Sequence, residues 1–148
     1  MSTAFESAQL NLQLFDMRRE PLLRKARDWF IMEFHPKAAD EYFALMATEK
    51  HSWVRMVVGY WDMAASLVVQ GAIDHAAFMA AHGEIVGTFA KLQPFLAEIR
   101  ARTGPHSLAH IETVVMAIPD AEAELERRRT RLRTAWESQQ ATKAGFIV

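Results

Sequence analysis

Asp62 is the residue with the clearest chemical potential, because it interrupts the longest apolar stretch of the chain, residues 53–69. Arg55, Gly59, Asp62 and Ser66 follow one another at steps of four, three and four positions, so on a helix they share one stripe. If this stripe faces solvent, its residues are ordinary surface. If it faces other helices, Asp62 is a buried carboxylate and needs a partner, because an unpaired buried charge is strongly destabilising.

Two arginines are the candidate partners of Asp62: Arg27, late in the second predicted helix, and Arg100, near the end of a long predicted helix. Arg55 lies seven positions from Asp62, too far for the local contact between helix residues three or four apart. We therefore expect an ionised Asp62 held by Arg27 or Arg100 in a buried polar cluster. We expect this cluster to be structural rather than catalytic.

A metal site is the alternative that the histidines suggest. His106 and His110 are four positions apart, a spacing that places two imidazoles on one helix face, with Glu112 nearby. The pair is not part of an HExxH pattern, and its spacing identifies no third ligand. His75 and His82 either supply that ligand or line a helix edge. We expect no cofactor.

Nucleophilic catalysis has little support. The chain has no cysteine, its serines fall at predicted caps or within predicted helices, and it has no GxSxG turn or glycine-rich phosphate loop after a strand. The sequence predicts no catalytic residue.

A run of arginines near the C-terminus is the strongest hint of nucleic-acid binding. Glu124 and Glu126 lie three or four positions before members of the run and absorb part of its charge. We therefore favour a solvated helix face over contact with DNA or RNA. The arginines are Arg127, Arg128, Arg129, Arg131 and Arg133.

The same C-terminal helix has a narrow apolar stripe, formed by Leu125, Leu132 and Trp136. A stripe this thin suits a helix that leans on the bundle or pairs with its copy. We predict that these three residues form an interface and that the protein is a homodimer.

Helical signals extend along the whole chain, and no segment alternates with period two. Asp74 and Ser52 are expected to cap helices, and Gly71 to end one in a left-handed conformation. The sequence predicts an all-α, single-domain bundle of about six to seven helices around a buried central helix, residues 53–69, with residues 1–4 and 141–148 frayed. The expected helices are 5–18, 21–34, 36–49, 52–70, 74–102, 106–117 and 119–140.

The segment 74–102 is favoured as one long helix, because its apolar positions keep one register across Gly83. Small residues at helical spacing, including Gly83, Gly87 and Ala90, would let another helix approach closely. Pro94 predicts a bend near residues 90–94. Two helices separated by a break at Gly83 are the alternative.

Composition places the chain among globular proteins: 148 residues, 51 % hydrophobic and 24 % charged. The net charge of −1 provides no field that attracts nucleic acid or an acidic membrane. The first twenty residues lack the features of a secretory signal, and no apolar run is long enough to span a membrane. We expect a soluble, cytoplasmic protein without membrane insertion.

Several segments resemble a family of small bacterial helical proteins of unknown function. They are the pair Ala26-Arg27, residues 57–62, 71–74 and 83–89, and the helix that ends at Arg100. The resemblance covers residues 14–102, with Phe89 where the family has tryptophan. It implies that Arg27, Asp62 and Arg100 are recurrent polar positions. Many members have an N-terminal membrane anchor, which we do not expect here, and no catalytic residue is implied.

Two classes of function follow from these observations, with nucleic-acid binding through Arg127 to Arg133 as a weaker third. The favoured one is a non-catalytic helical module that acts through protein–protein contact or self-association. The alternative is an enzyme or sensor with a small-molecule or metal site between helices, near Asp62 or the pair His106 and His110. A cavity lined by Asp62 would favour this alternative.

Overall fold

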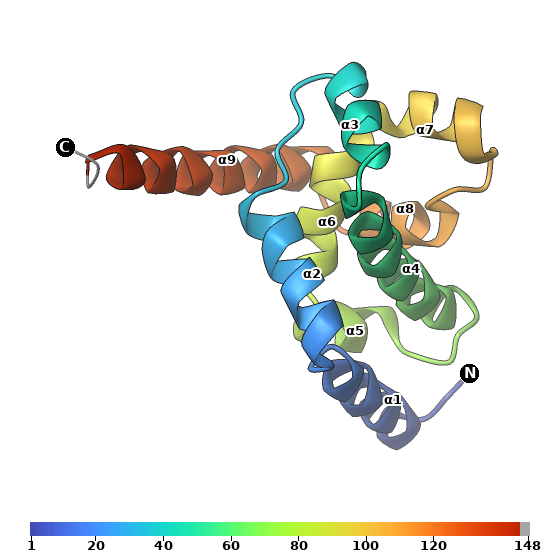
Figure 1. Ribbon diagram of the computed structural model, residues 1–148. Helices are drawn as coiled ribbons and strands as arrows, with labels where there is room; N and C mark the ends of the chain where they lie inside the picture. Colours follow the sequence, from blue (N-terminus) through green and yellow to red (C-terminus); the bar gives the residue numbers. More distant parts are fainter. Residues whose placement is uncertain (146–148) are drawn as a thin grey trace.

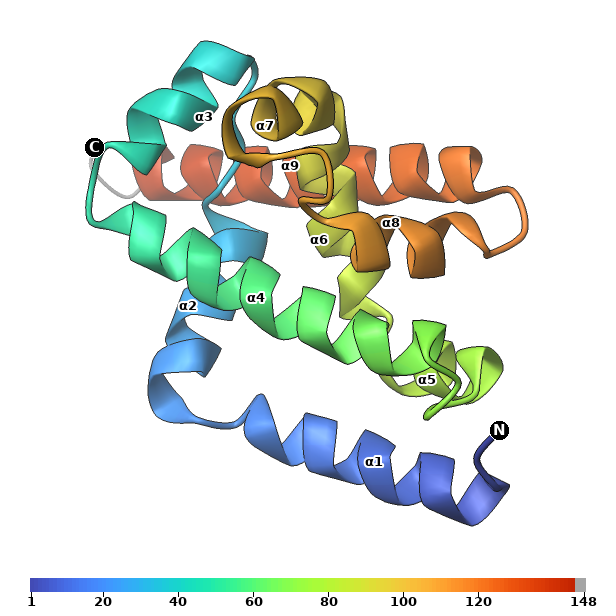
Figure 2. The same cartoon turned by 90° about the vertical axis from the view of Figure 1, so that its right-hand side faces the viewer.

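The computed structural model describes residues 1–145. Within this range every regular element is a helix, so the predicted all-α class is confirmed (Figures 1 and 2). In chain order the elements are α1 (Ala4–Met17), α2 (Pro21–Met32), α3 (Ala39–Met46), α4 (Lys50–Val69), α5 (His75–Ala81), α6 (Glu84–Leu92), the 3-10 turn η1 (Gln93–Phe95), α7 (Leu96–Thr103), α8 (Ala109–Met116) and α9 (Ala121–Gly145).

Two of the three predicted helix-end residues take their expected roles. The Asp74 side chain accepts a hydrogen bond from the first turn of α5, and Gly71 follows α4 with a φ of +81°, which favours glycine. Ser52 is not a cap, because α4 begins earlier, at Lys50. The Ser52 hydroxyl instead donates to the backbone carbonyl of Glu49 at 2.9 Å.

The described chain ends are regular, not frayed as predicted. Thr3 caps α1, and the Ser2 hydroxyl donates to the backbone carbonyl of Ala72 at 2.6 Å, which ties the start of α1 to the turn after α4. At the other end α9 continues to Gly145. The remainder of the predicted frayed tail, residues 146–148, lies outside the described residues.

Residues 74–102 do not form one helix, and the alternative with a break at Gly83 is correct. α5 ends at Ala81, and the next residue, His82, turns the chain before α6 with a φ of −127° and a ψ of 45°. This turn places the buried His82 ring against the rings of Trp61 and Phe78, with centroid distances of 5.9 and 4.9 Å. Packing of His82 in the core therefore favours a break in the helix, although the apolar positions on both sides fit a single helix. The predicted bend lies at η1, which contains Pro94.

The most buried helix is α6, not α4 as the sequence suggested. Every residue from Ile85 to Leu92 is buried, and α6 contacts α2, α8 and α9 (Figure 2). α4 buries one face, with Trp61 fully inaccessible, but leaves Met63 and Val69 exposed. The small residues of α6 explain the difference, because they let neighbouring helices pack closely around it.

α9 crosses α6 where the predicted small residues lie. Leu132 Cδ1 is only 3.4 Å from where a side chain at Gly87 would begin. Leu125 is fully buried in the chain's own core, and the Trp136 ring packs on His35 at 5.1 Å. The predicted interface stripe is therefore wrong, because these side chains hold α9 to its own bundle. The later part of α9 projects from the body (Figure 1).

Among residues 1–145, no helix combines the length and the apolar character that crossing a membrane requires.

Candidate functional site

Asp62 is partnered by α8, not by either predicted arginine. One carboxylate oxygen accepts the backbone N–H of Ile111 at 3.2 Å, and the other lies 3.0 Å from His110 Nδ1. Arg27 and Arg100 both bind other carboxylates. The predicted cluster of Arg27, Asp62 and Arg100 is thus wrong: the three residues lie in three separate polar contacts.

The conformation of Leu108 explains this partner. Leu108 precedes α8 in a left-handed conformation, with a φ of 59°, and its apolar side chain provides no cap. The first N–H groups of a helix need acceptors, and a carboxylate there also complements the helix dipole. Asp62 of α4 thus supplies from another helix the cap that α8 lacks locally.

The predicted metal pair is not formed on one helix face. α8 begins at Ala109, so His110 is helical whereas His106 lies in the exposed turn before it. The spacing of four positions aligns two rings only when both belong to one helix. Within residues 1–145, no group of three or more histidine, cysteine, aspartate or glutamate side chains is placed to hold a metal ion.

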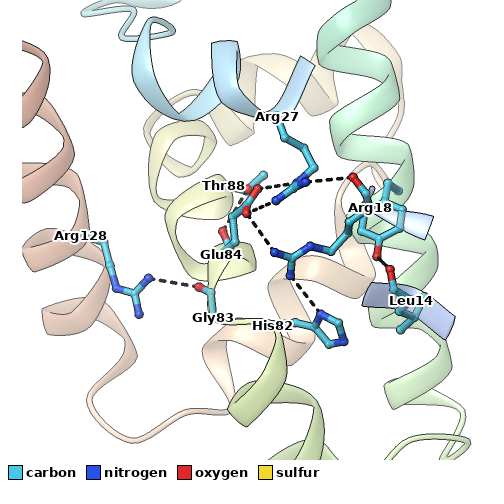
Figure 3. Close-up of polar contacts among 9 residues, drawn as sticks. Leu14, Arg18, Arg27, His82, Gly83, Glu84, Thr88 and Arg128 are labelled. Atoms are coloured by element: carbon cyan, nitrogen blue, oxygen red, sulfur yellow. Dashed lines mark hydrogen bonds and ion pairs between the residues drawn. The ribbon is translucent and has the colours of Figure 1, made fainter. Parts of the chain in front are cut away.

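Arg27 is the one predicted cluster residue that lies in a mostly buried ionic network, but its partner is Glu84 (Figure 3). Its Nε and Nη2 donate to the two carboxylate oxygens of Glu84 at 2.9 and 2.6 Å. Arg18 Nη2 lies 3.6 Å from the same carboxylate, and Arg18 Nη1 lies 3.4 Å from His82 Nδ1. The network joins α2 and α6 to the segment after α1.

Burial and charge act differently on the members of this network. Burial lowers the pKa of Arg27, but the hydrogen bonds and charge of Glu84 outweigh it and raise that pKa overall. Burial and the charge of Arg27 lower the pKa of Arg18. Burial and Arg18 also lower the pKa of His82, which favours the neutral ring. One carboxylate therefore serves two guanidinium groups, and the network fits a structural role.

Arg100 fixes the loop that joins α7 to α8. Its Nε donates to the backbone carbonyl of Ser107 and its Nη2 to the Glu112 carboxylate, both at 3.0 Å. These bonds hold the loop residues 104–108 against the body. Ser107 and Leu108 of this loop line a cavity.

This cavity, of about 460 Å³, lies between α3, α4 and α7 and is lined by Asp62. We call it the Asp62 pocket. Gly59 belongs to its wall, and no atom lies within 4 Å of a side chain built at that position. At the rim, the Arg102 guanidinium lies 3.6 Å from the centre of the Phe43 ring. The other apolar lining side chains are Tyr42, Met46, Val54, Val58, Leu92, Ile99 and Leu108.

Residues 3–117 match the protein family described as Domain of unknown function (DUF4760). The chain belongs to this family. The match confirms the suspected resemblance and extends it beyond residues 14–102 in both directions. In this DUF4760 protein the match contains the Arg27–Glu84 network and the Asp62 pocket, but not α9. Searches of curated proteins and of solved structures each found no match.

The arginines of α9 serve the DUF4760 protein largely as internal contacts. Arg127 and Arg128 both bind Glu124, and Arg128 also donates to the Gly83 carbonyl at 3.1 Å. Arg129 binds Glu126 and donates to the Ala90 carbonyl at 2.9 Å. The predicted local pairing with Glu124 and Glu126 is confirmed. Arg131 and Arg133 form no ion pair within the part of the chain that the structure describes.

Sequence reasoning missed Glu84, Arg18 and Lys91 as buried or half-buried charged residues. Glu84 follows Gly83 and resembles an ordinary first-turn acid of a helix. The position of Lys91 could have indicated its burial, because it lies among the apolar positions of residues 85–92. A cation at such a position is buried only when it has acceptors, and the sequence does not identify them.

Proposed function

We propose that the protein binds a small molecule with an apolar body and a polar end in the Asp62 pocket, without catalysing a reaction. The observation that carries this proposal is the pocket itself. Its volume of about 460 Å³ is typical of ligand sites, and its wall is mainly aromatic and aliphatic.

The polar groups of the pocket support a ligand with one polar end. Arg55, Arg102 and His51 line the pocket together with Asp62, whereas its interior side is apolar. Each Asp62 oxygen accepts one hydrogen bond in the protein and retains capacity for another. His51, Arg55 and Asp62 are spread along α4, so a ligand that reaches Asp62 is oriented by that carboxylate at one end of the row.

Gly59 offers the sharpest test, because Gly59→Leu would place a side chain in the open space of the pocket. The probe is 8-anilinonaphthalene-1-sulfonate, which has apolar rings and one charged end. We expect saturable fluorescence enhancement with the native protein and at least about tenfold weaker binding by Gly59→Leu. Ser52→Leu adds the same side chain at an exposed position of α4 and should bind like the native protein. Equal binding by all three folded proteins would overturn the proposal.

Self-association through α1 is a second candidate, supported by the exposed apolar side chains of that helix. Phe5, Leu12 and Phe15 are 70, 71 and 49 % exposed, and with Ala8 they follow the spacing of a helix-pairing seam. This seam replaces the stripe of α9 as the proposed homodimer interface. Light scattering over a dilution series should give twice the monomer mass for the native protein and the monomer mass for Leu12→Glu. The cytoplasmic location stays a prediction.

A further inference from the structure

A second, smaller cavity lies between the end of α2, η1 and α9, and its charged lining is entirely basic. Its volume is about 60 Å³. Lys37, Lys91, Arg129 and Arg133 line it together with His35, and no carboxylate does. We call it the basic pocket. The chain as a whole has 17 lysines and arginines and 18 aspartates and glutamates, so the basic pocket is a local separation of charge.

Lys91 is the innermost cation of the basic pocket and is only 6 % exposed. Its ammonium group donates to three backbone carbonyls at the end of α2, those of Phe30, Ile31 and Phe34, at 2.6 to 2.8 Å. These carbonyls satisfy its three donors and complement its charge as a helix C-terminus does. They are neutral groups, however, so the protonated form of Lys91 keeps its net positive charge in the pocket.

The other cations leave this charge uncompensated. Arg129 is neutralised by Glu126, at 2.8 Å. Within residues 1–145, the side-chain cations of Lys37, Lys91 and Arg133 form no ion pair within 4.0 Å. The nearest acid to this end of the pocket is Glu41, whose carboxylate accepts the backbone N–H of Lys37 at 2.8 Å. Burial lowers the pKa of Lys91 to about 7, and Arg133 contributes to this shift. The pKa of His35 falls to about 4 through burial and the charge of Lys91.

We infer that the basic pocket binds a small tetrahedral oxyanion, as free phosphate or sulfate or as the phosphate group of a larger molecule. The volume of about 60 Å³ is well above the roughly 10 to 15 Å³ that a single water molecule requires, so the pocket admits a small polyatomic group. Arginine and lysine together provide the donors and the charge that such anions require. Below its pKa of about 7, Lys91 is protonated and its charge strengthens binding, while Arg133 and Lys37 make the contacts.

This inference is independent of the Asp62 pocket. The Asp62 pocket is bounded by α3, α4 and α7 and has an apolar wall, whereas the basic pocket depends on α9, which lies outside the family match. Failure of one proposal therefore leaves the other intact.

Arg133→Gln tests the inference, with Arg131→Gln as its matched control. Both changes remove one arginine charge from an exposed position of α9, but only Arg133 lines the basic pocket. The dissociation constants of inorganic phosphate and sulfate are measured by isothermal titration calorimetry at constant ionic strength, with chloride and acetate as comparison anions. Lys37→Gln is the second variant, in case Arg133→Gln does not fold.

We expect saturable binding of phosphate and sulfate, but not of acetate, by the native protein and by Arg131→Gln. Binding by Arg133→Gln or Lys37→Gln should be at least about tenfold weaker. Binding of phosphate but not of sulfate would identify phosphate as the ligand. Two results would overturn the inference. One is equal binding of phosphate and sulfate by the native protein and all three variants, and the other is a heat of phosphate or sulfate titration no larger than that of chloride.

Discussion

The guanidinium group of Arg27 and the carboxylate of Glu84 form a bidentate ion pair, although the residues are 57 positions apart in the chain. The pair joins α2 to the first turn of α6, the most buried helix. Charged hydrogen bonds of this geometry are about twice as strong as neutral ones and also fix the relative orientation of the two helices.

We predict that Glu84→Ala lowers the free energy of unfolding by about 3 to 5 kcal/mol, because it leaves the mostly buried Arg27 and Arg18 without their carboxylate. Urea denaturation measures this loss. The control, Glu98→Ala in an exposed position of α7, should change stability by less than about 0.5 kcal/mol. A loss below about 1 kcal/mol for Glu84→Ala would show that the pair contributes as little as a surface ion pair.

Because Asp62 caps α8 and does not pair with a buried arginine, removing its carboxylate should lower the free energy of unfolding only moderately. Asp62→Ala removes the acceptor of the Ile111 N–H and should cost about 0.5 to 2 kcal/mol. Asp62→Asn keeps one carbonyl oxygen and should recover part of this loss. Thermal denaturation of both variants is the measurement. A loss of about 3 to 5 kcal/mol for Asp62→Ala would instead point to a dry, buried ion pair.

The buried Lys91 predicts a dependence of stability on pH. Its pKa falls from 10.5 to about 7 on folding because of burial and Arg133. Between these two values the unfolded chain binds more protons, so the free energy of unfolding rises with pH by up to about 1.4 kcal/mol per unit. Below about pH 7 both states are protonated, and the cost of burying the charge is fully present.

Lys91→Met separates this dependence from that of other groups, since it removes the titrating amine and keeps an unbranched side chain. The stability of the native protein relative to Lys91→Met should increase between about pH 7 and 9.5. Urea denaturation at several pH values measures this difference. A constant difference across the range would mean that the three carbonyl acceptors keep the ammonium form in the folded protein.

Gly59 and Gly71 predict opposite effects of substitution by alanine. No atom obstructs a side chain at Gly59 within α4, so Gly59→Ala should stabilise the protein by about 0.5 to 1 kcal/mol. At Gly71 there is also space, but its φ of +81° is strained for alanine, so Gly71→Ala should destabilise the protein by about 1 kcal/mol. Calorimetric melting curves measure both. Destabilisation by Gly59→Ala would mean that the pocket wall has no room for a methyl group.

Local patterns in the sequence determined the helical class, the roles of Gly71 and Asp74 at helix ends, and the pairing of Glu124 and Glu126 with following arginines. Each depends on neighbours within a few positions or on an apolar periodicity, and both are present in the sequence itself. The family resemblance likewise followed from local segments.

Only the tertiary structure decided which polar groups meet. Arg27 binds Glu84 instead of Asp62, and Asp62 caps α8, because these contacts depend on how helices far apart in the chain cross one another. The break at His82 was decided in the same way, by a fit against Trp61 that outweighed a continuous helical register. Polar contacts require matching of atoms to within a few tenths of an ångström. Periodicity specifies which face of a helix is buried, but not what lies opposite each residue of that face.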